Sequence, residues 1–301
     1  MSMPFLFSVS SVSSVSSVLV FAFMFTFQAA SSRTITVAGG TLAYDEAGRG
    51  PAVILLHGAF LDRHTWDLQM PALAGSHRAV RYDIRPFGES SLPEQPYKTT
   101  DDLLALMDAL KIERAHLVGH SFGGGVAIDF ALEHPTRVAS LTLVNSGVTG
   151  ATLPADEQKE AMQVFMAARE SEASAVQAWL TLSLWSASRS RPEVMKAIER
   201  ATASSAARFR MAAPPFAPIT PPAIGRLGEI RAATLVVSGD RDTPGNRANS
   251  ETVAKGIAGA RLVVIPGADH AIPIGWAKEL NDALRAFLNM TVKRDLKKPQ
   301  I

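Results

Sequence analysis

The stretch LVGHSFGGG, residues 117–125, places one serine among four glycines directly after an apolar run. Its segment Gly119–Gly123 matches the pattern G-x-S-x-G. We expect a strand over Ala115–His120 and a helix over Phe122–Glu133, which is the context in which this pattern presents a nucleophile. A sharp strand-to-helix turn holds Ser121 in a strained conformation, and side chains two positions away on either side would collide. Glycine is therefore needed at both positions.

Other uses of a glycine-rich turn fit this stretch less well. A P-loop reads G-x-x-x-x-G-K-[ST], and no lysine follows these glycines. A dinucleotide-binding turn reads G-x-G-x-x-G after the first strand, and that spacing is absent. A turn that only packs a helix tightly on a sheet remains an alternative. The start of a helix stabilises negative charge, which favours a nucleophile at this place.

A serine hydroxyl is a weak nucleophile without a base, and the base needs an acid to orient it. In folds with this motif the chain order is serine, then aspartate or glutamate, then histidine. Of the seven histidines, His134 and His270 follow Ser121. His134 lies at the far end of the helix that begins at the serine, more than about 12 Å along its axis. His270, in the loop after the last predicted strand, is therefore the predicted base.

The predicted acid lies in the loop GDRDTP, residues 239–244, which follows a predicted strand. Of its two aspartates we favour Asp242, which is deeper in the loop. Asp240 remains an alternative, and we expect it to cap the turn or to pair with Arg241. Asp269, directly before the predicted base, is expected to be a surface or turn residue.

A tetrahedral intermediate needs two N–H donors. The backbone of Phe122, directly after the serine, supplies one of them. The other comes from the loop after the apolar run AVILLHG, where Ala59 is favoured and Phe60 remains an alternative. His57 opens this loop, and we expect it to make structural hydrogen bonds because the role of base is already filled.

The rest of the chain alternates strands and helices, which indicates an α/β domain with a mostly parallel central sheet flanked by helices. Beyond residue 150 the sequence predicts several helices and then a proline-rich loop. We expect a core of residues 33–149 and 226–290, a helical cap of residues 150–225 inserted after the sixth strand, and a basic tail of residues 291–301. Helices besides the one after the serine are expected at Trp66–Leu73, Thr100–Leu110, Ser250–Ile257 and Trp276–Leu288.

Composition excludes several classes of protein and site. The formal net charge is +2, and the basic cluster Lys293, Arg294, Lys297 and Lys298 is expected to be a solvated tail, so no nucleic acid partner is expected. Cysteine is absent, which excludes disulfides, thiolate metal sites and a cysteine nucleophile. The predicted chemistry requires no metal and no cofactor.

Residues 1–32 differ from the rest of the chain. A low-complexity segment runs into the uncharged stretch VLVFAFMFTF, which small residues follow. This apolar run is shorter than the ~20 residues that span a bilayer, and it fits the core of a signal peptide. It predicts export to the periplasm or the medium, with no stable membrane span in the mature protein. Because no Lys or Arg precedes the run, a leader from a start codon placed too far upstream is the alternative, and it predicts a cytoplasmic protein.

Together these motifs resemble the α/β-hydrolase fold superfamily, from about Thr34 to Leu288. HGAF, DIRPFGES, GHSFGGG, GDRDTP and GADH occur in the order that this family shows. The resemblance implies a helical cap after the sixth strand, the catalytic acid at Asp242 and an oxyanion donor at Ala59. Pro86 departs from the usual D-x-R-G-x-G-x-S, in a loop that shapes the entrance of the site. The serine nucleophile means that the activities of aspartate-nucleophile members, haloalkane dehalogenases and epoxide hydrolases, are not implied.

The resulting hypothesis is a serine hydrolase that cleaves a small to medium carboxylic ester or lactone through an acyl-enzyme. Perhydrolase or haloperoxidase-like chemistry and C–C bond hydrolysis are alternatives, and a non-enzymatic, receptor-like ligand-binding protein is an alternative of another class. Phe60 and Trp185 are the predicted substrate-binding residues. Further apolar cap residues are expected partly over the pocket and partly in the core of the cap: Met162, Met166, Trp179, Leu182 and Leu184.

Overall fold

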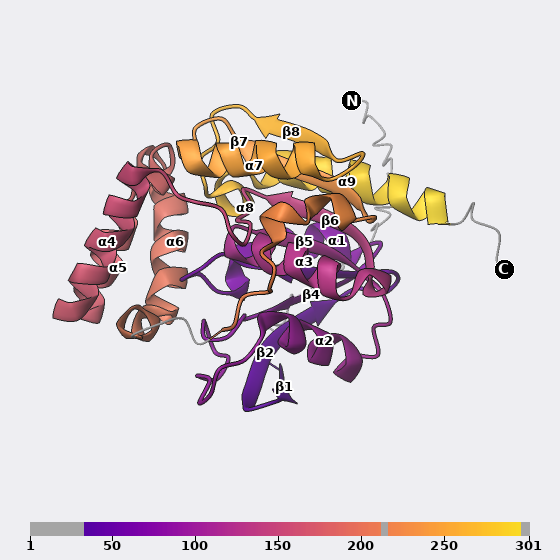
Figure 1. Ribbon diagram of the computed structural model, residues 1–301, viewed down its shortest axis with the longest axis horizontal. Coiled ribbons are helices and arrows are strands. Elements are labelled where there is room, and N and C mark those ends of the chain that lie inside the picture. The colour runs from indigo at the N-terminus through magenta and orange to yellow at the C-terminus, as the bar shows by residue number, and fades with distance from the viewer. Residues whose placement is uncertain (1–32, 212–215, 296–301) are drawn as a thin grey trace, which may run out of the picture. The chain divides into compact units, whose positions relative to one another are not determined.

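The structure is a computed structural model that describes residues 33–211 and 216–295, so the predicted leader lies outside the described residues. Its sheet has eight strands in the order β1-β2-β4-β3-β5-β6-β7-β8 (Figure 1). The pairs β1·β2 and β2·β4 are antiparallel, and the strands from β4 to β8 are parallel. The predicted mostly parallel sheet is confirmed. The strands are β1 Arg33–Val37, β2 Gly40–Ala47, β3 Ala52–Leu56, β4 Arg78–Tyr82, β5 Ala115–His120, β6 Val138–Val144, β7 Ala233–Gly239 and β8 Arg261–Ile265.

Helices cover both faces of the sheet, because alternate residues of each central strand point to opposite sides. In β3, Ile54 and Leu56 belong to one buried cluster, which α2 and α3 complete. Val53 and Leu55 belong to a second cluster, which α1, α8 and α9 complete. The helices are α1 Met70–Ala74, α2 Thr99–Ala109, α3 Phe122–Glu133, α4 Ala155–Glu170, α5 Glu172–Leu180, α6 Pro192–Ser204, α7 Pro244–Gly256, α8 Ile272–Gly275 and α9 Ala277–Asp295.

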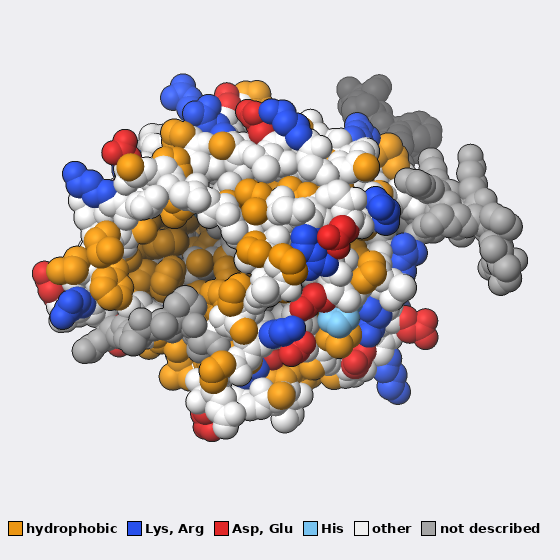
Figure 2. Space-filling model, in the orientation of Figure 1, with side chains coloured by type: hydrophobic (Ala, Val, Ile, Leu, Met, Phe, Trp, Pro, Cys, Tyr) orange, Lys and Arg blue, Asp and Glu red, His pale blue; other side chains and the backbone are white. Residues whose placement is uncertain are grey.

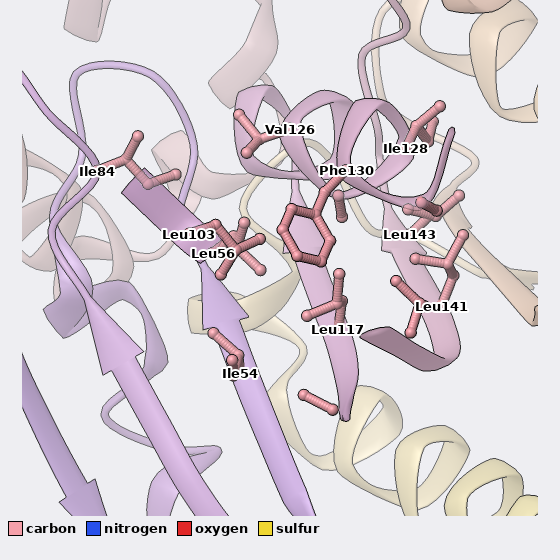
Figure 3. Close-up of a cluster of buried hydrophobic side chains, with 14 of the residues drawn as sticks. Ile54, Leu56, Ile84, Leu103, Leu117, Val126, Ile128, Phe130, Leu141 and Leu143 are labelled. Atoms are coloured by element: carbon pink, nitrogen blue, oxygen red, sulfur yellow. The ribbon is translucent and has the colours of Figure 1, made fainter. Parts of the chain in front are cut away.

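The first cluster holds α3 against the middle of the sheet. Figure 3 shows Phe130 of α3 pointing toward Leu117 of β5, with Leu141 and Leu143 of β6 beside it. Phe130 and these three leucines have no exposed surface. This packing fixes the axis of α3, and therefore the position of the residue at which the chain turns from β5 into the helix.

Three helices differ from their predicted limits. The predicted helix Trp66–Leu73 was wrong: a 3-10 turn ends at Trp66 and α1 begins at Met70, with Pro71 in its first turn, the place that suits a residue without an N–H. Helix α7 starts at Pro244 rather than Ser250, because the Thr243 hydroxyl caps it by accepting a hydrogen bond from Asn246 N. Helix α9 continues to Asp295, so the predicted basic tail is helical at its start. In residues 33–211 and 216–295 no helix has both the length and the apolar character needed to cross a bilayer.

The segment between β6 and β7 contains α4, α5 and α6, which lie together at one end of the view in Figure 1. They share a buried cluster that includes Val164, Val176 and Ile198. Met162 and Met166 were expected over the pocket or in this cluster, but they are 57% and 52% exposed. The described residues form one compact unit, so the helical segment is not a separate one, and the residue limits of the cap stay a prediction.

The turn from β5 into α3 depends on direct backbone contacts. A Cβ at residue 123 would lie 2.4 Å from Leu56 O and 2.5 Å from His57 O, and a Cβ at residue 119 would lie 2.4 Å from Gly123 O. These distances are far below van der Waals contact, so the predicted collision of side chains is confirmed. Gly125 differs, because the nearest atom to a Cβ there is 3.6 Å away.

Gly123→Ala and Gly125→Ala form a matched pair in the first turns of α3. We expect Gly123→Ala to lower the free energy of unfolding by about 1–3 kcal/mol or more, because backbone atoms of β3 must move. Gly125→Ala is expected to raise it by up to ~1 kcal/mol, because alanine loses less backbone entropy in a helix. Urea denaturation of both variants measures the difference. Equal free energies of unfolding would contradict this account of the turn.

Candidate active site

Ser121 lies at the turn between β5 and α3 with φ 53° and ψ −117°, a conformation that side chains rarely adopt. Hydrogen bonds on both sides hold it there. Its N–H donates to Val144 O over 2.9 Å, and its C=O accepts from Gly124 N and Gly147 N, each at 3.0 Å. Bonds to two neighbouring segments offset the strain, and they fix the direction of the hydroxyl.

His270 and Asp242 are brought together as the sequence predicts. His270 Nδ1 lies 2.8 Å from Asp242 Oδ2, and each residue is 4% exposed. Asp242 Oδ1 accepts hydrogen bonds from Thr243 N at 2.7 Å and from Asn246 Nδ2 at 3.0 Å. With Nδ1–H donating to the carboxylate, the Nε2 atom of His270 is left as the acceptor that a general base requires.

Ser121 and His270 line the same cavity, which has a volume of about 560 Å³. Ser121 follows β5 and His270 follows β8, so both come from the carboxyl ends of parallel strands, where ligands bind in open α/β sheets. Among the described residues no hydrogen bond joins the two side chains. Such contacts are often long in unliganded enzymes and tighten when substrate binds.

The candidate oxyanion donors lie on either side of Ser121. Phe122 is the first residue of α3, where N–H groups have no partner within the helix. Leu56 pairs in register with Gly119, so the loop that follows β3 runs beside the residues that follow β5. A Cβ at Gly58 would lie 3.3 Å from Ser121 Cβ, which places the next residue, Ala59, at the serine as well. Ala59 and Phe60 both line the cavity, and the choice between their N–H groups stays open.

Two buried histidines bind the backbone of loops that form the site. His57 accepts a hydrogen bond from Ile84 N at Nε2 over 2.9 Å and lies 2.8 Å from Gly58 O at Nδ1, the structural role expected from the sequence. His120 Nε2 donates to His270 O over 2.8 Å. Burial lowers the pKa of His57, and burial together with the nearby His270 lowers the pKa of His120 well below its usual value. Both imidazoles are therefore neutral at pH 7.

Asp269 was expected at the surface or in a turn, but it has no exposed surface. It accepts hydrogen bonds from the cap, from Ala187 N at 3.0 Å, Ser188 N at 2.6 Å and Ser188 Oγ at 2.9 Å. The next residue, His270, donates its N–H to Leu184 O of the cap over 3.2 Å. No sequence motif signals these bonds, because they join segments far apart in the chain. Asp240 accepts a hydrogen bond from Gly267 N at 2.7 Å, so it binds the loop after β8 rather than its own turn.

The walls of the cavity are largely aromatic and aliphatic. Figure 2 shows a hollow whose surface is mainly hydrophobic. Phe60 and Trp185, the two predicted substrate-binding residues, both line it, and the Trp185 ring lies 5.8 Å from the His270 ring. Phe60 stacks on Phe209 of the cap, with ring centroids 4.0 Å apart. The remaining aromatic and apolar lining includes Pro86, Phe87, Trp179, Leu182, Leu184 and Phe216.

Comparisons with known proteins agree with this fold. A family model described as alpha/beta hydrolase fold matches residues 51–275. The chain is 30% identical to a 2-hydroxy-6-oxo-6-phenylhexa-2,4-dienoate hydrolase of Comamonas testosteroni. The alignment of 268 residues covers 81% of this chain and 90% of that protein. A solved hydrolase from Pseudomonas aeruginosa PA01 is 29% identical with a TM-score of 0.73, over 87% of this chain and 99% of that one. The enol-lactonase from Burkholderia xenovorans LB400 is 26% identical with a TM-score of 0.70, over 85% of this chain and 100% of that one.

The match to the family model extends over more than half of the chain, and the mostly parallel sheet and the strand–turn–helix at Ser121 are those expected from the sequence. The protein belongs to the α/β-hydrolase fold family and is a hydrolase.

Proposed function

We propose that the protein cleaves a small to medium carboxylic ester or lactone through an acyl-enzyme on Ser121. The observation that carries this proposal is the shared cavity, in which a serine held in a strained turn faces the same space as a histidine bonded to a buried carboxylate. These are the parts of an activated nucleophile, its base and the residue that orients the base.

The mechanism follows from the proposed roles. His270 Nε2 takes the proton of the Ser121 hydroxyl as the oxygen attacks the substrate carbonyl, and Asp242 stabilises the imidazolium that forms. The N–H groups of Phe122 and of Ala59 or Phe60 stabilise the oxyanion. His270 then gives its proton to the leaving alcohol. Water activated by the same imidazole hydrolyses the acyl-enzyme.

The cavity supports an uncharged acyl group of modest size next to the reacting carbonyl. Its volume of about 560 Å³ lies in the ~300–1,000 Å³ range of pockets for small molecules. Aromatic side chains around Ser121 and His270 would exclude water from the oxyanion and so strengthen its hydrogen bonds. The similarity to an enol-lactonase supports lactones as substrates.

Hydrolysis of a C–C bond is a second candidate function. It is favoured by the identity of 30%, over 81% of this chain, with a protein named as a 2-hydroxy-6-oxo-6-phenylhexa-2,4-dienoate hydrolase. The same serine, histidine and aspartate would serve this reaction, so the substrate has to distinguish the two functions.

Ser121→Ala is expected to abolish turnover, with a loss on the order of 10⁴- to 10⁶-fold in kcat, because the acyl-enzyme cannot form. The measurement is hydrolysis of p-nitrophenyl esters of graded acyl length, with lactones and a 2-hydroxy-6-oxo-dienoate assayed in parallel. Labelling by a fluorophosphonate should occur in the wild type and fail in the variant.

The substrates separate the candidates in this experiment. Turnover of the dienoate with none of the esters or lactones would favour C–C hydrolysis. If the wild-type protein turns over none of these substrates and its serine does not react with the fluorophosphonate, the protein would be a ligand-binding protein. That result would contradict the proposal.

Asp269 is proposed as a positioning residue that acts through the backbone of His270. It connects the loop of the base to the cap through Ala187 and Ser188, whose donors satisfy its buried carboxyl oxygens. Because His270 is the next residue, a shift of this connection displaces the imidazole relative to Ser121. Displacements of about 1 Å cost on the order of 100-fold in rate.

Asp269→Asn should therefore lower kcat by about 10- to 100-fold while KM changes little, because the cavity walls stay in place. Asp240→Asn is the matched control, since Asp240 caps the same loop at Gly267 and makes no hydrogen bond with the cap. It should change kcat less than about 3-fold. Ser188→Ala combined with Asp269→Asn should be non-additive in kcat. Equal effects of the Asp240 and Asp269 variants would contradict the positioning role.

A further inference from the structure

Arg208 is a cation in the wall of an otherwise largely apolar cavity. It belongs to the 3-10 turn Ala206–Arg210 of the cap, and the next residue, Phe209, stacks on Phe60. The guanidinium makes one long hydrogen bond, from Nη2 to Ser90 O at 3.5 Å. Its Nε is buried and has no partner among the described residues. Most of its donors therefore have no partner in the part of the chain that the structure describes.

No carboxylate of the described residues forms an ion pair with Arg208, in contrast to the buried Arg63 and Arg85, which bind Asp83 and Asp102. Residues 1–32, 212–215 and 296–301 contain no Asp or Glu. Partial burial lowers the pKa of the Arg208 guanidinium from its usual value, and the nearby Tyr97 opposes this effect. Arg208 thus holds a positive charge partly out of water, with no carboxylate paired to it among the described residues.

The two carboxylates in the cavity wall already have other partners. Glu157 accepts from Gly245 N at 2.7 Å, at the start of α7. Glu160 accepts from Ser183 N at 3.0 Å and Ser183 Oγ at 2.8 Å, within the cap. Arg208 instead contacts the loop after β4 through Ser90. Neither acid is therefore paired with Arg208 among the described residues.

We propose that Arg208 binds a carboxylate carried by the substrate, so that the preferred ester or lactone bears an acid group away from the bond that is cleaved. This inference rests on the proposed function, because the carboxylate would occupy the cavity that Ser121 and His270 share. A planar guanidinium matches a carboxylate with two parallel hydrogen bonds, and partial exclusion of water strengthens them. The desolvation of Arg208 is then compensated when substrate binds.

The test compares esters that differ in one charge. Wild type, Arg208→Met and Arg208→Lys are assayed with the p-nitrophenyl monoesters of adipic and suberic acid and with the neutral hexanoate and octanoate esters of the same lengths. Wild type should prefer the acid-bearing ester of at least one length. Arg208→Met should lower kcat/KM for that ester by about 10- to 100-fold and for its neutral partner by less than about 3-fold. Arg208→Lys should restore part of the loss.

Arg169→Met is the matched control, because it removes the same charge from the exposed end of α4, outside the cavity. Arg169→Met should leave the preference for the acid-bearing ester unchanged. This control distinguishes a direct contact of Arg208 with the carboxylate from an effect of the net charge of the cap. Equal losses on charged and neutral esters in Arg208→Met would mean that Arg208 only supports the cap, and the proposal would be wrong. A wild-type preference for the neutral ester at both lengths would overturn it as well.

A binding measurement keeps this proposal separate from the proposed function. Calorimetry with Ser121→Ala should give tighter binding of monomethyl suberate than of dimethyl suberate, and Arg208→Met in the same background should remove that difference. If wild type hydrolyses neither kind of ester, the proposed function fails while this comparison still decides the role of Arg208. Equal affinity for the two suberates in Ser121→Ala would reject a carboxylate site.

Discussion

The start of α3 lies so close to the backbone of β3 that residue 123 has room for no side chain. This contact fixes the rest of the site. It makes the chain turn within one residue, so Ser121 takes a positive φ at the edge of the cavity that it lines. It also brings the start of α3 beside the loop after β3, which supports the proposal that one amide from each stabilises the oxyanion. The buried packing of Phe130 on Leu117 keeps the helix pressed against the strand.

The cap is connected to the site by more than the apolar cluster beneath it. Hydrogen bonds run from the cap backbone to Asp269 and His270, and Glu157 at the start of α4 binds the start of α7, next to the loop of Asp242. The helices that form the roof of the cavity therefore also hold the loops of the proposed base and acid. In this molecule a change in the cap that alters substrate selection is expected to alter the rate of the chemistry too.

The features that the sequence predicted depend on residues close together in the chain or on the order of residues along it. The turn at Ser121, the strand before it and the helix after it follow from apolar runs and glycines, and β5 and α3 have the predicted limits. The order of serine, aspartate and histidine identified the residues that the structure brings together, because order is a property of the chain. Helix limits were less certain where a single proline or cap residue decides them, as at Pro71 and Thr243.

Contacts between distant segments were not predictable in this way. The role of Asp269 depends on Ser188, 81 residues earlier, and a carboxylate beside a loop histidine looks the same in sequence whether it is exposed or buried. That Arg208 has no paired carboxylate among the described residues is visible once the positions of the acids around it are known. Both features concern polar side chains that are shielded from water. The partners of such side chains are known only from the three-dimensional structure.

The two buried histidines behind the site have a consequence for acid conditions. Because burial lowers the pKa of His57 and of His120 in the folded chain, the unfolded chain binds more protons below pH 6.5. The stability that these groups contribute is complete above that pH and is lost as the pH falls, by up to about 1.4 kcal/mol per pH unit for each. Mild acid would therefore weaken the scaffold that aligns the base, because His120 binds the backbone of His270. The folded chain is therefore expected to be more stable at neutral pH than in mild acid.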